Sequence, residues 1–110
     1  RFFVSEIIRE KILRRYRDEI PYACEVAVEF FQEDKENDIS RISASIFVMR
    51  EQQKYIIIGK GGQAIKSLGI DARKDIEKFL GQQVFLELLV KVKDNWRDDD
   101  KMLKKFGYKE

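Results

Sequence analysis

Three glycines lie within four positions near the middle of this chain, at Gly59, Gly61 and Gly62. Glycine accepts positive φ values, and its missing side chain lets another molecule approach the main chain closely. Isoleucines at 56–58 lead into the cluster, and a helical pattern follows it from Ile65. The free N–H groups at the start of a helix attract phosphate, and Lys60 adds a positive charge. The segment therefore predicts a loop that binds an anionic ligand through its backbone.

Alternating apolar residues predict three strands, because a period of two is typical of a strand with one buried face. The first run places these residues on one face: Tyr22, Cys24, Val26, Val28 and Phe30. The second run does the same: Ile42, Ala44, Ile46 and Val48. The third follows the glycines: Val84, Leu86, Leu88, Val90 and Val92. The polar residues 32–38 predict a loop between the first two strands.

Two segments have the apolar period of a helix. The first covers residues 2–20 and is expected to end at Pro21, because the residue before proline disfavours the α region. Its stripe contains these residues: Phe3, Val4, Ile7, Ile8, Ile12, Leu13 and Tyr16. The second begins at Gly62 and ends at a Gly81 cap. Its stripe contains these residues: Ile65, Leu68, Ala72, Ile76 and Phe79.

The tail predicts a short helix, with aspartates 98–100 in its first turn and lysines towards its end, as the helix dipole favours. Trp96 is expected to begin it and to pack against the sheet edge. Residues 51–58 are ambiguous, since three isoleucines favour a strand but only four residues are apolar. The pattern predicts an α+β domain with helices on one face of a small sheet.

Composition excludes several classes of protein. The chain has 110 residues, which predicts one domain, and its 44% hydrophobic and 38% charged residues argue against disorder. It has no histidine and one cysteine, Cys24, so a catalytic triad, an internal disulfide and a Cys/His metal site are impossible. The lone thiol is expected to be buried in a cytoplasmic protein. The absence of an initiating Met suggests part of a longer protein.

Positive charge gathers around the glycines although the net charge is only +2. Lys54, Lys60 and Lys66 are uninterrupted by an acid between Gln52 and Asp71, whereas residues 33–38 are acidic. Arg73, between Asp71 and Asp75, is expected to be an ion-pair partner, with the reading of bases as the alternative.

Three kinds of glycine loop compete for this segment. The phosphate-binding pattern GxxxxGK[ST] fails, because Gln63 follows Gly62 and Ile65 precedes Lys66. The dinucleotide pattern GxGxxG/A matches formally, but only one strand follows, and it carries lysines where an acid should bind ribose. The third is the GXXG loop of KH modules, which clamps about four nucleotides of single-stranded RNA.

The segment IIIGKGGQAI resembles the KH core pattern, an aliphatic residue followed by Ile-Gly-x-x-Gly-x-x-Ile. The order of elements resembles the type II KH domain, α-β-β-α-α-β, here with a C-terminal helix. The resemblance implies a short helix at 52–58 and a three-stranded mixed sheet. It implies that residues 1–110 form one RNA-binding domain.

Further blocks are similar to the C-terminal KH domain of the Era family of bacterial GTPases, which act in small-subunit ribosome assembly. These blocks are RFFVSEIIREKIL, IPY, GIDARKDIEKFLG, VFLELLVKVKDNWRDD and LKKFGY. The resemblance implies a preceding GTPase domain that binds GTP and Mg, while this chain has no cofactor, no metal and no catalytic residues. It implies single-stranded 3′-terminal ribosomal RNA and the small ribosomal subunit as partners, and peripheral membrane association of the parent protein.

The expected RNA-binding residues surround the loop: Lys54, Ile58, Gly59, Lys60, Gly61, Gly62, Ile65 and Lys66. The acidic loop 33–38 is expected to flank the RNA groove. An alternative is a protein-interaction module that docks a GTPase domain or another chain through Phe47, Met49, Phe85 and Leu89. A nucleotide-binding enzyme fragment is a weaker alternative.

Overall fold

The computed structural model describes residues 1–94 and 96–108. The helices are α1 (Phe2–Arg15), α2 (Ile20–Ala23), α3 (Glu51–Ile58), α4 (Gln63–Leu80) and α5 (Asp100–Lys105). The strands are β1 (Glu25–Asp34), β2 (Ile39–Val48) and β3 (Gln83–Val92), and 3-10 turns occupy Lys60–Gly62 and Trp96–Asp98. Within the described residues, no helix is long and apolar enough to cross a membrane.

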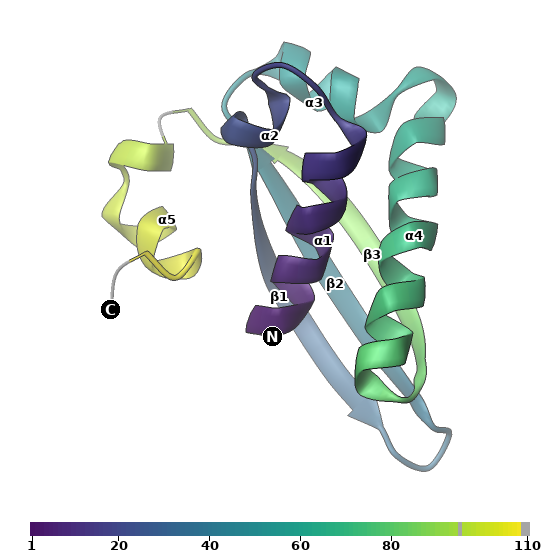
Figure 1. Cartoon of the computed structure of the whole chain (residues 1–110). Helices are drawn as coiled ribbons and strands as arrows, with labels where there is room; N and C mark the ends of the chain where they lie inside the picture. Colours follow the sequence, from purple (N-terminus) through teal and green to yellow (C-terminus); the bar gives the residue numbers. More distant parts are fainter. Residues whose placement is uncertain (95, 109–110) are drawn as a thin grey trace.

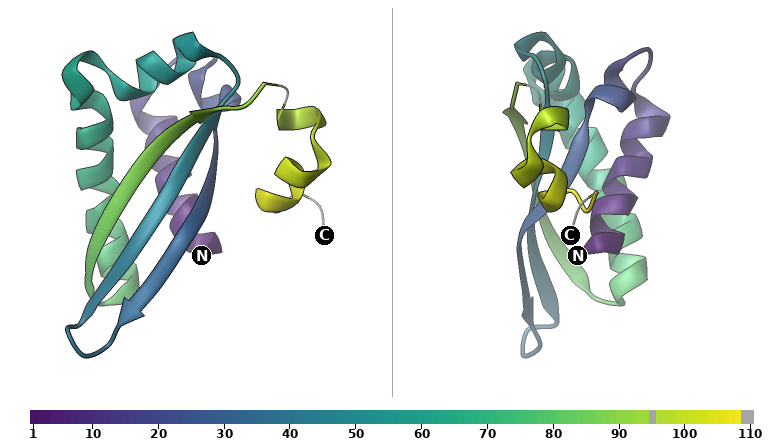
Figure 2. Two further views of the ribbon diagram at one scale, coloured as in Figure 1. Left: turned by 180° about the vertical axis from the view of Figure 1, so that it is seen from behind. Right: turned by 90° about the vertical axis from the view of Figure 1, so that its left-hand side faces the viewer.

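The strands form one mixed sheet in the order β1-β2-β3, with β1 antiparallel and β3 parallel to β2. Helices α1 and α4 lie side by side over one face, and α3 lies at the end where β2 finishes (Figure 1). Seen from behind, the opposite face carries no long helix (Figure 2). The expected α+β architecture with a three-stranded mixed sheet is therefore confirmed.

The core lies between α1, α4 and the inner face of the sheet. Its fully buried members include Ile8, Ile12, Ile42, Ile46, Ile57, Leu68 and Ile76. The inner face of β2 agrees with the predicted alternation, since all four of its predicted residues are buried. Cys24 is buried as predicted, and burial raises the pKa of its thiol to about 12.

The predicted face of the first strand is wrong at both ends. Tyr22 belongs to α2 and is 72% exposed, because β1 begins only at Glu25. A β-bulge then shifts the register between Val28 and Phe30, so Phe31 packs against the core and Phe30 is exposed. The strand also continues to Asp34, which limits the predicted loop to the turn at 35–38.

The first helix ends earlier than predicted, at Arg15, and Pro21 lies in the first turn of α2. Tyr16 takes an extended conformation, and its hydroxyl donates to the carbonyl of Ile57 at 2.7 Å. This bond satisfies a carbonyl in the last turn of α3. The chain therefore leaves the helix where Tyr16 can reach α3.

Residues 51–58 form a helix, as the family resemblance implies and against the strand propensity of the isoleucines. Buried Gln53 caps the helix: its Oε1 accepts the N–H groups of Met49 and Arg50, each at 3.0 Å. Ile57 lies one turn further along and is fully buried. Capping and one buried stripe outweigh local propensity here.

The segment after β3 packs beside the β1 edge and reaches the outer face of the sheet (Figure 2). Trp96 is buried as expected, and its Nε1 donates to the carbonyl of Ala23 at 3.4 Å. It begins a separate 3-10 turn, and α5 starts at Asp100 with Asp99 as its cap. The ring of Phe106 lies 5.3 Å from both Trp96 and Phe47. Phe47 is thereby only 6% exposed, so its predicted role in an exposed docking face is wrong.

Candidate nucleic-acid interface

The glycine loop joins two helices through three residues with positive φ. Gly59 ends α3 at φ 76°, Gly61 continues at φ 62°, and Gly62 precedes α4 at φ 76°. The N–H of Gly59 donates to the carbonyl of Tyr55 at 2.9 Å, and that of Gly62 donates to Gly59 at 3.1 Å. The loop is a defined hydrogen-bonded turn whose conformation favours glycine.

Gly59 is also required by packing. A Cβ atom placed on it would lie 2.5 Å from the Cβ of Ala64. Gly61 and Gly62 differ, because a Cβ there would meet no atom within 4 Å. Gly59 thus fixes the contact between α3 and α4, whereas Gly61 and Gly62 leave their outer surface open to a ligand.

Positive charge meets the start of α4 at this loop. Lys60 and Gly61 are exposed, and α4 extends over 18 residues behind them. Its first turn has no acidic residue and no side-chain cap. The positive end of the helix and the lysine therefore both face solvent, an arrangement that suits a phosphate group.

A groove of about 300 Å³ continues from the loop between α4 and β3. Helix α4 lines one wall with Ile65, Lys66, Gly69, Ile70 and Arg73, and β3 lines the other with Leu86 and Leu88. Among the described residues, strand β3 pairs only with β2, so its other edge leaves backbone N–H and C=O groups unpaired within the sheet. The groove thus combines an apolar floor with backbone groups that are able to hydrogen-bond a base.

Gly69 keeps the middle of this groove free of a side chain. A Cβ added there would lie 3.7 Å from Cδ1 of Leu88, an ordinary contact distance. Its φ lies outside the left-handed region, so neither conformation nor packing demands glycine at this position. What the glycine does provide is open volume.

The structure brings some of the predicted site residues together. Ile65 and Lys66 line the groove, and the loop from Gly59 to Gly62 lies at its start. Lys54 and Ile58 lie on α3 and are half-buried, and neither lines the groove. The acidic hairpin approaches the opposite end, where Asp38 lines a neighbouring hollow together with Arg73.

Arg73 does not form the predicted ion pairs. Asp71 pairs with Arg15 at 3.3 Å, and Asp75 pairs with Lys11 at 2.6 Å, both across the contact with α1. The hydrogen bond from Lys11 holds the pKa of the Asp75 carboxyl below its usual range. Residues two positions apart on a helix do not face each other, so Arg73 points away from both acids. That spacing is visible in the sequence and could have placed Arg73 in the groove.

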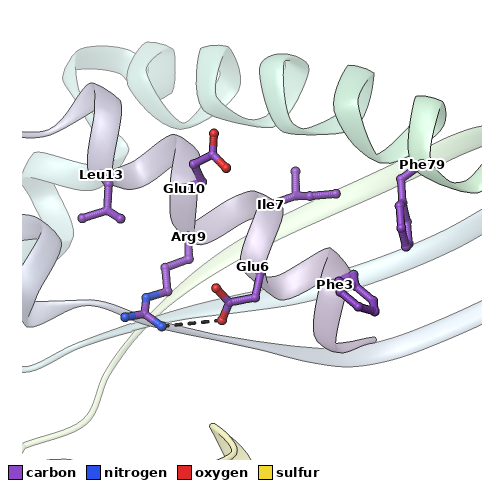
Figure 3. A pocket seen from close by; sticks show the side chains of 7 residues that line it. All are labelled: Phe3, Glu6, Ile7, Arg9, Glu10, Leu13 and Phe79. Carbon is purple, nitrogen blue, oxygen red and sulfur yellow. Dashed lines mark ion pairs between the residues drawn. The ribbon is translucent and has the colours of Figure 1, made fainter.

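A second exposed feature lies on α1 (Figure 3). Phe3, Leu13 and Phe79, which belong to the predicted apolar stripes of these helices, are each more than half exposed. Phe3 and Phe79 approach from α1 and α4 with ring centroids 5.4 Å apart, beside a hollow of about 400 Å³. Glu6 and Arg9 form an ion pair along the same hollow, at 3.5 Å (Figure 3).

The described residues contain no group of three or more Cys, Asp or Glu side chains placed to bind a metal ion. The loop also lacks the Lys-Ser/Thr pair that binds nucleotide phosphates and Mg²⁺. The residues therefore do not fit GTP with Mg²⁺, and what the site offers is a backbone clamp beside a groove.

Comparison with known proteins supports this geometry. A KH domain family model matches residues 19–97. The chain is 51% identical over its whole length to GTPase Era of Syntrophus aciditrophicus, and 50% identical over 98% of its length to GTPase Era of Geobacter metallireducens. It covers 36% of each relative, or about a third of their length.

Two solved structures superpose on the whole chain with a TM-score of 0.93 and 39% identity. One is a variant of Aquifex aeolicus Era bound to GDP and AlF4⁻, and the other is Era in complex with MgGDPNP and nucleotides 1506–1542 of 16S ribosomal RNA. The chain covers 37% of each of these proteins.

Proposed function

The chain belongs to the KH domain family, and from this premise we propose that it binds single-stranded RNA through the loop Gly59–Gly62 and the groove between α4 and β3. KH domains are RNA-binding modules, and their GXXG loop clamps about four nucleotides through the backbone. Here the exposed loop, the start of α4 and Lys60 hold phosphates. The bases lie along the groove, with Ile65 beneath them and Lys66 at its wall.

The single observation that carries the proposal is the continuity of the loop with the groove. A backbone clamp without an adjoining groove would bind any small anion. In this chain, the residue that follows the loop by three positions, Ile65, already lines the groove. An RNA strand whose phosphates are held at Lys60 therefore directs its bases to an apolar surface beside the free edge of β3.

The RNA that we propose is the 3′ end of small-subunit ribosomal RNA. This is supported by the 16S ribosomal RNA present in the complex of the related Era, which is 39% identical to this chain. The remaining two thirds of such a protein would be a GTPase domain that binds GTP and Mg²⁺, acting on the small ribosomal subunit in the cytoplasm. Peripheral membrane association would then also be a property of the longer protein. Lys54 and Ile58 support the loop from α3 in this proposal.

A second candidate function is the docking of another protein, favoured by the exposed rings of Phe3 and Phe79 (Figure 3). This hollow lies on α1, whereas the proposed RNA groove lies beyond α4, so the two surfaces are separable by mutation. Phe85 and Leu89 are also exposed, on the outer face of the sheet. Met49, the remaining residue expected to dock a protein, is half-buried.

Titration of short single-stranded RNAs tests the proposal. Binding of a pyrimidine-rich and a random-sequence RNA is measured by fluorescence anisotropy at two salt concentrations. In Lys60→Ala, the slope of log affinity against log salt should become shallower by roughly 0.7, the value for one phosphate of a single strand. Phe3→Ser should bind as the parent does. Loss of RNA binding in Phe3→Ser with none in Lys60→Ala would contradict the proposed RNA site, whereas a folded parent that binds neither RNA would favour protein docking.

A further inference from the structure

Arg73 lies where the apolar groove meets a second, polar hollow of about 730 Å³. This hollow lies between the end of α4, the start of β3 and the β1-β2 hairpin, and its lining includes Asp38, Glu77, Gln82 and Gln83. Arg73 is the one described residue that lines both spaces. Its guanidinium forms no ion pair with any side chain in the described part of the chain.

The two ends of the groove differ in charge. At the loop end, Lys60 and Lys66 are exposed, and no carboxylate lines the groove itself. At the far end, the hollow contains the carboxylates of Asp38 and Glu77. Glu77 accepts the N–H of Val84 at 2.9 Å, which holds its carboxylate at this position. Two negative groups repel phosphate, so the far end suits a neutral group with both donors and acceptors, as a nucleobase has.

The spacing also fits a base. Arg73 follows the first residue of α4 by ten positions, or about 15 Å at a rise of 1.5 Å per residue. Nucleotides along one strand of a duplex are about 3.4 Å apart along the axis, so at that spacing 15 Å corresponds to about four nucleotides. The base at Arg73 would thus lie at the end of the segment that the loop begins.

We propose that Arg73 determines base specificity at the far end of the groove, by donating hydrogen bonds to acceptors on the edge of one base. This inference rests on the proposed RNA-binding function. Arginine presents five donors in a planar fork, a geometry that lysine lacks. Single-stranded RNA exposes its Watson–Crick and Hoogsteen edges to such groups. Lys60 positions the strand, and Arg73 distinguishes the bases.

The experiment uses eight-nucleotide oligo(A), oligo(C), oligo(G) and oligo(U) as probes. Affinities are measured for the parent chain, Arg73→Gln, Arg73→Lys and the control Lys74→Gln, an exposed neighbour outside the groove. A bidentate contact contributes about 1–3 kcal/mol of discrimination, or about 5- to 150-fold in affinity. Arg73→Gln and Arg73→Lys should both reduce the ratio between the tightest and weakest probes by at least fivefold. The weakest probe and the salt dependence should stay unchanged, and Lys74→Gln should match the parent.

Four results would overturn the inference. If Arg73→Lys binds all four probes with parental affinity, Arg73 acts only as a positive charge that binds phosphate. The same conclusion follows if Arg73→Gln weakens binding of all four probes equally and reduces the salt slope. If the ratio is unchanged in both variants, Arg73 does not read a base. If the folded parent binds none of the four probes, the proposed function fails, and this inference fails with it.

Discussion

Gly59 and Ala64 pack so closely across the loop that a Cβ atom on Gly59 would also lie 3.0 Å from the backbone nitrogen of Ala64. This contact connects the end of α3 to the first turn of α4. It sets the direction in which the loop presents Lys60 and Gly61 to solvent. The geometry of the proposed phosphate clamp therefore depends on a residue that itself faces inward.

Gly59→Ala should destabilise the fold more than Gly61→Ala does. Gly61, at φ 62° and ψ 20°, lies near the left-handed region, which costs about 1–2 kcal/mol for a residue with a Cβ. Gly59, at φ 76° and ψ 175°, lies in a region that is essentially restricted to glycine. Only at Gly59 does the added Cβ also clash, at 2.5 Å from the Cβ of Ala64, so the free energy of unfolding should fall by at least about 1 kcal/mol more in Gly59→Ala than in Gly61→Ala. Urea denaturation of the two variants measures the difference. Equal losses would contradict the contact with Ala64.

Gly69→Ala should stabilise the chain while Gly69→Leu impairs RNA binding. Alanine in a helix interior is about 1 kcal/mol more favourable than glycine, and the added methyl meets Leu88 at an ordinary distance. A leucine would occupy the groove that bases are proposed to enter. Thermal unfolding and RNA titration of both variants are the measurements. Parental RNA affinity in a folded Gly69→Leu variant would exclude the middle of the groove as the binding surface.

Phe106→Ala should cost about 2 kcal/mol, because its ring lies against both Phe47 and Trp96. The matched control is Phe85→Ala on the same face of the sheet, which should change stability by no more than about 0.5 kcal/mol. Phe85 is 56% exposed, so little packing is lost there. A similar small effect in both variants, measured by urea denaturation, would mean that the C-terminal segment does not stabilise the domain.

The buried thiol of Cys24 should make stability decrease at alkaline pH. Its folded pKa of about 12 exceeds the unfolded value of about 8.5, so the folded state keeps a proton that the unfolded state loses. The stability of the parent relative to Cys24→Ala should fall by about 2 kcal/mol between pH 8 and pH 10. Urea denaturation of both proteins at these pH values tests this. Parallel pH dependences would show that the thiol is accessible to solvent.

The sequence predicts the structure most accurately where one local signal decides it. The inner face of β2 follows from strict alternation, and the glycine loop follows from its composition. In β1, by contrast, Phe30 and Phe31 are equally apolar, and the pairing of Phe31 with Ile42 across the bulge decides which one faces the core. No period of two along β1 contains that information.

Contacts between distant segments account for the other differences. Phe47 is covered by Phe106, which lies far along the chain. The local pattern of β2 contains no sign of this contact, and it therefore predicts that Phe47 is exposed. Asp71 and Asp75 are engaged by α1, which leaves Arg73 free to line the groove. The loop of the candidate site could thus be predicted from local sequence. The far end of its groove could be predicted only with knowledge of how α1 packs against α4, because that packing engages Asp71 and Asp75.

The double variant Lys60→Asp with Gly61→Asp tests the central claim most directly. The fold should survive, because both residues are exposed, a Cβ on Gly61 meets open space, and aspartate tolerates a left-handed conformation better than most residues. The matched control is Lys101→Asp with Gly107→Asp, which makes the same change of charge at an exposed lysine and an open glycine on the C-terminal segment. With circular dichroism and thermal unfolding unchanged, the loop variant should bind single-stranded RNA at least about a hundredfold more weakly than the control, since carboxylates would meet the phosphates. A folded loop variant that binds RNA as tightly as the control would contradict the GXXG site.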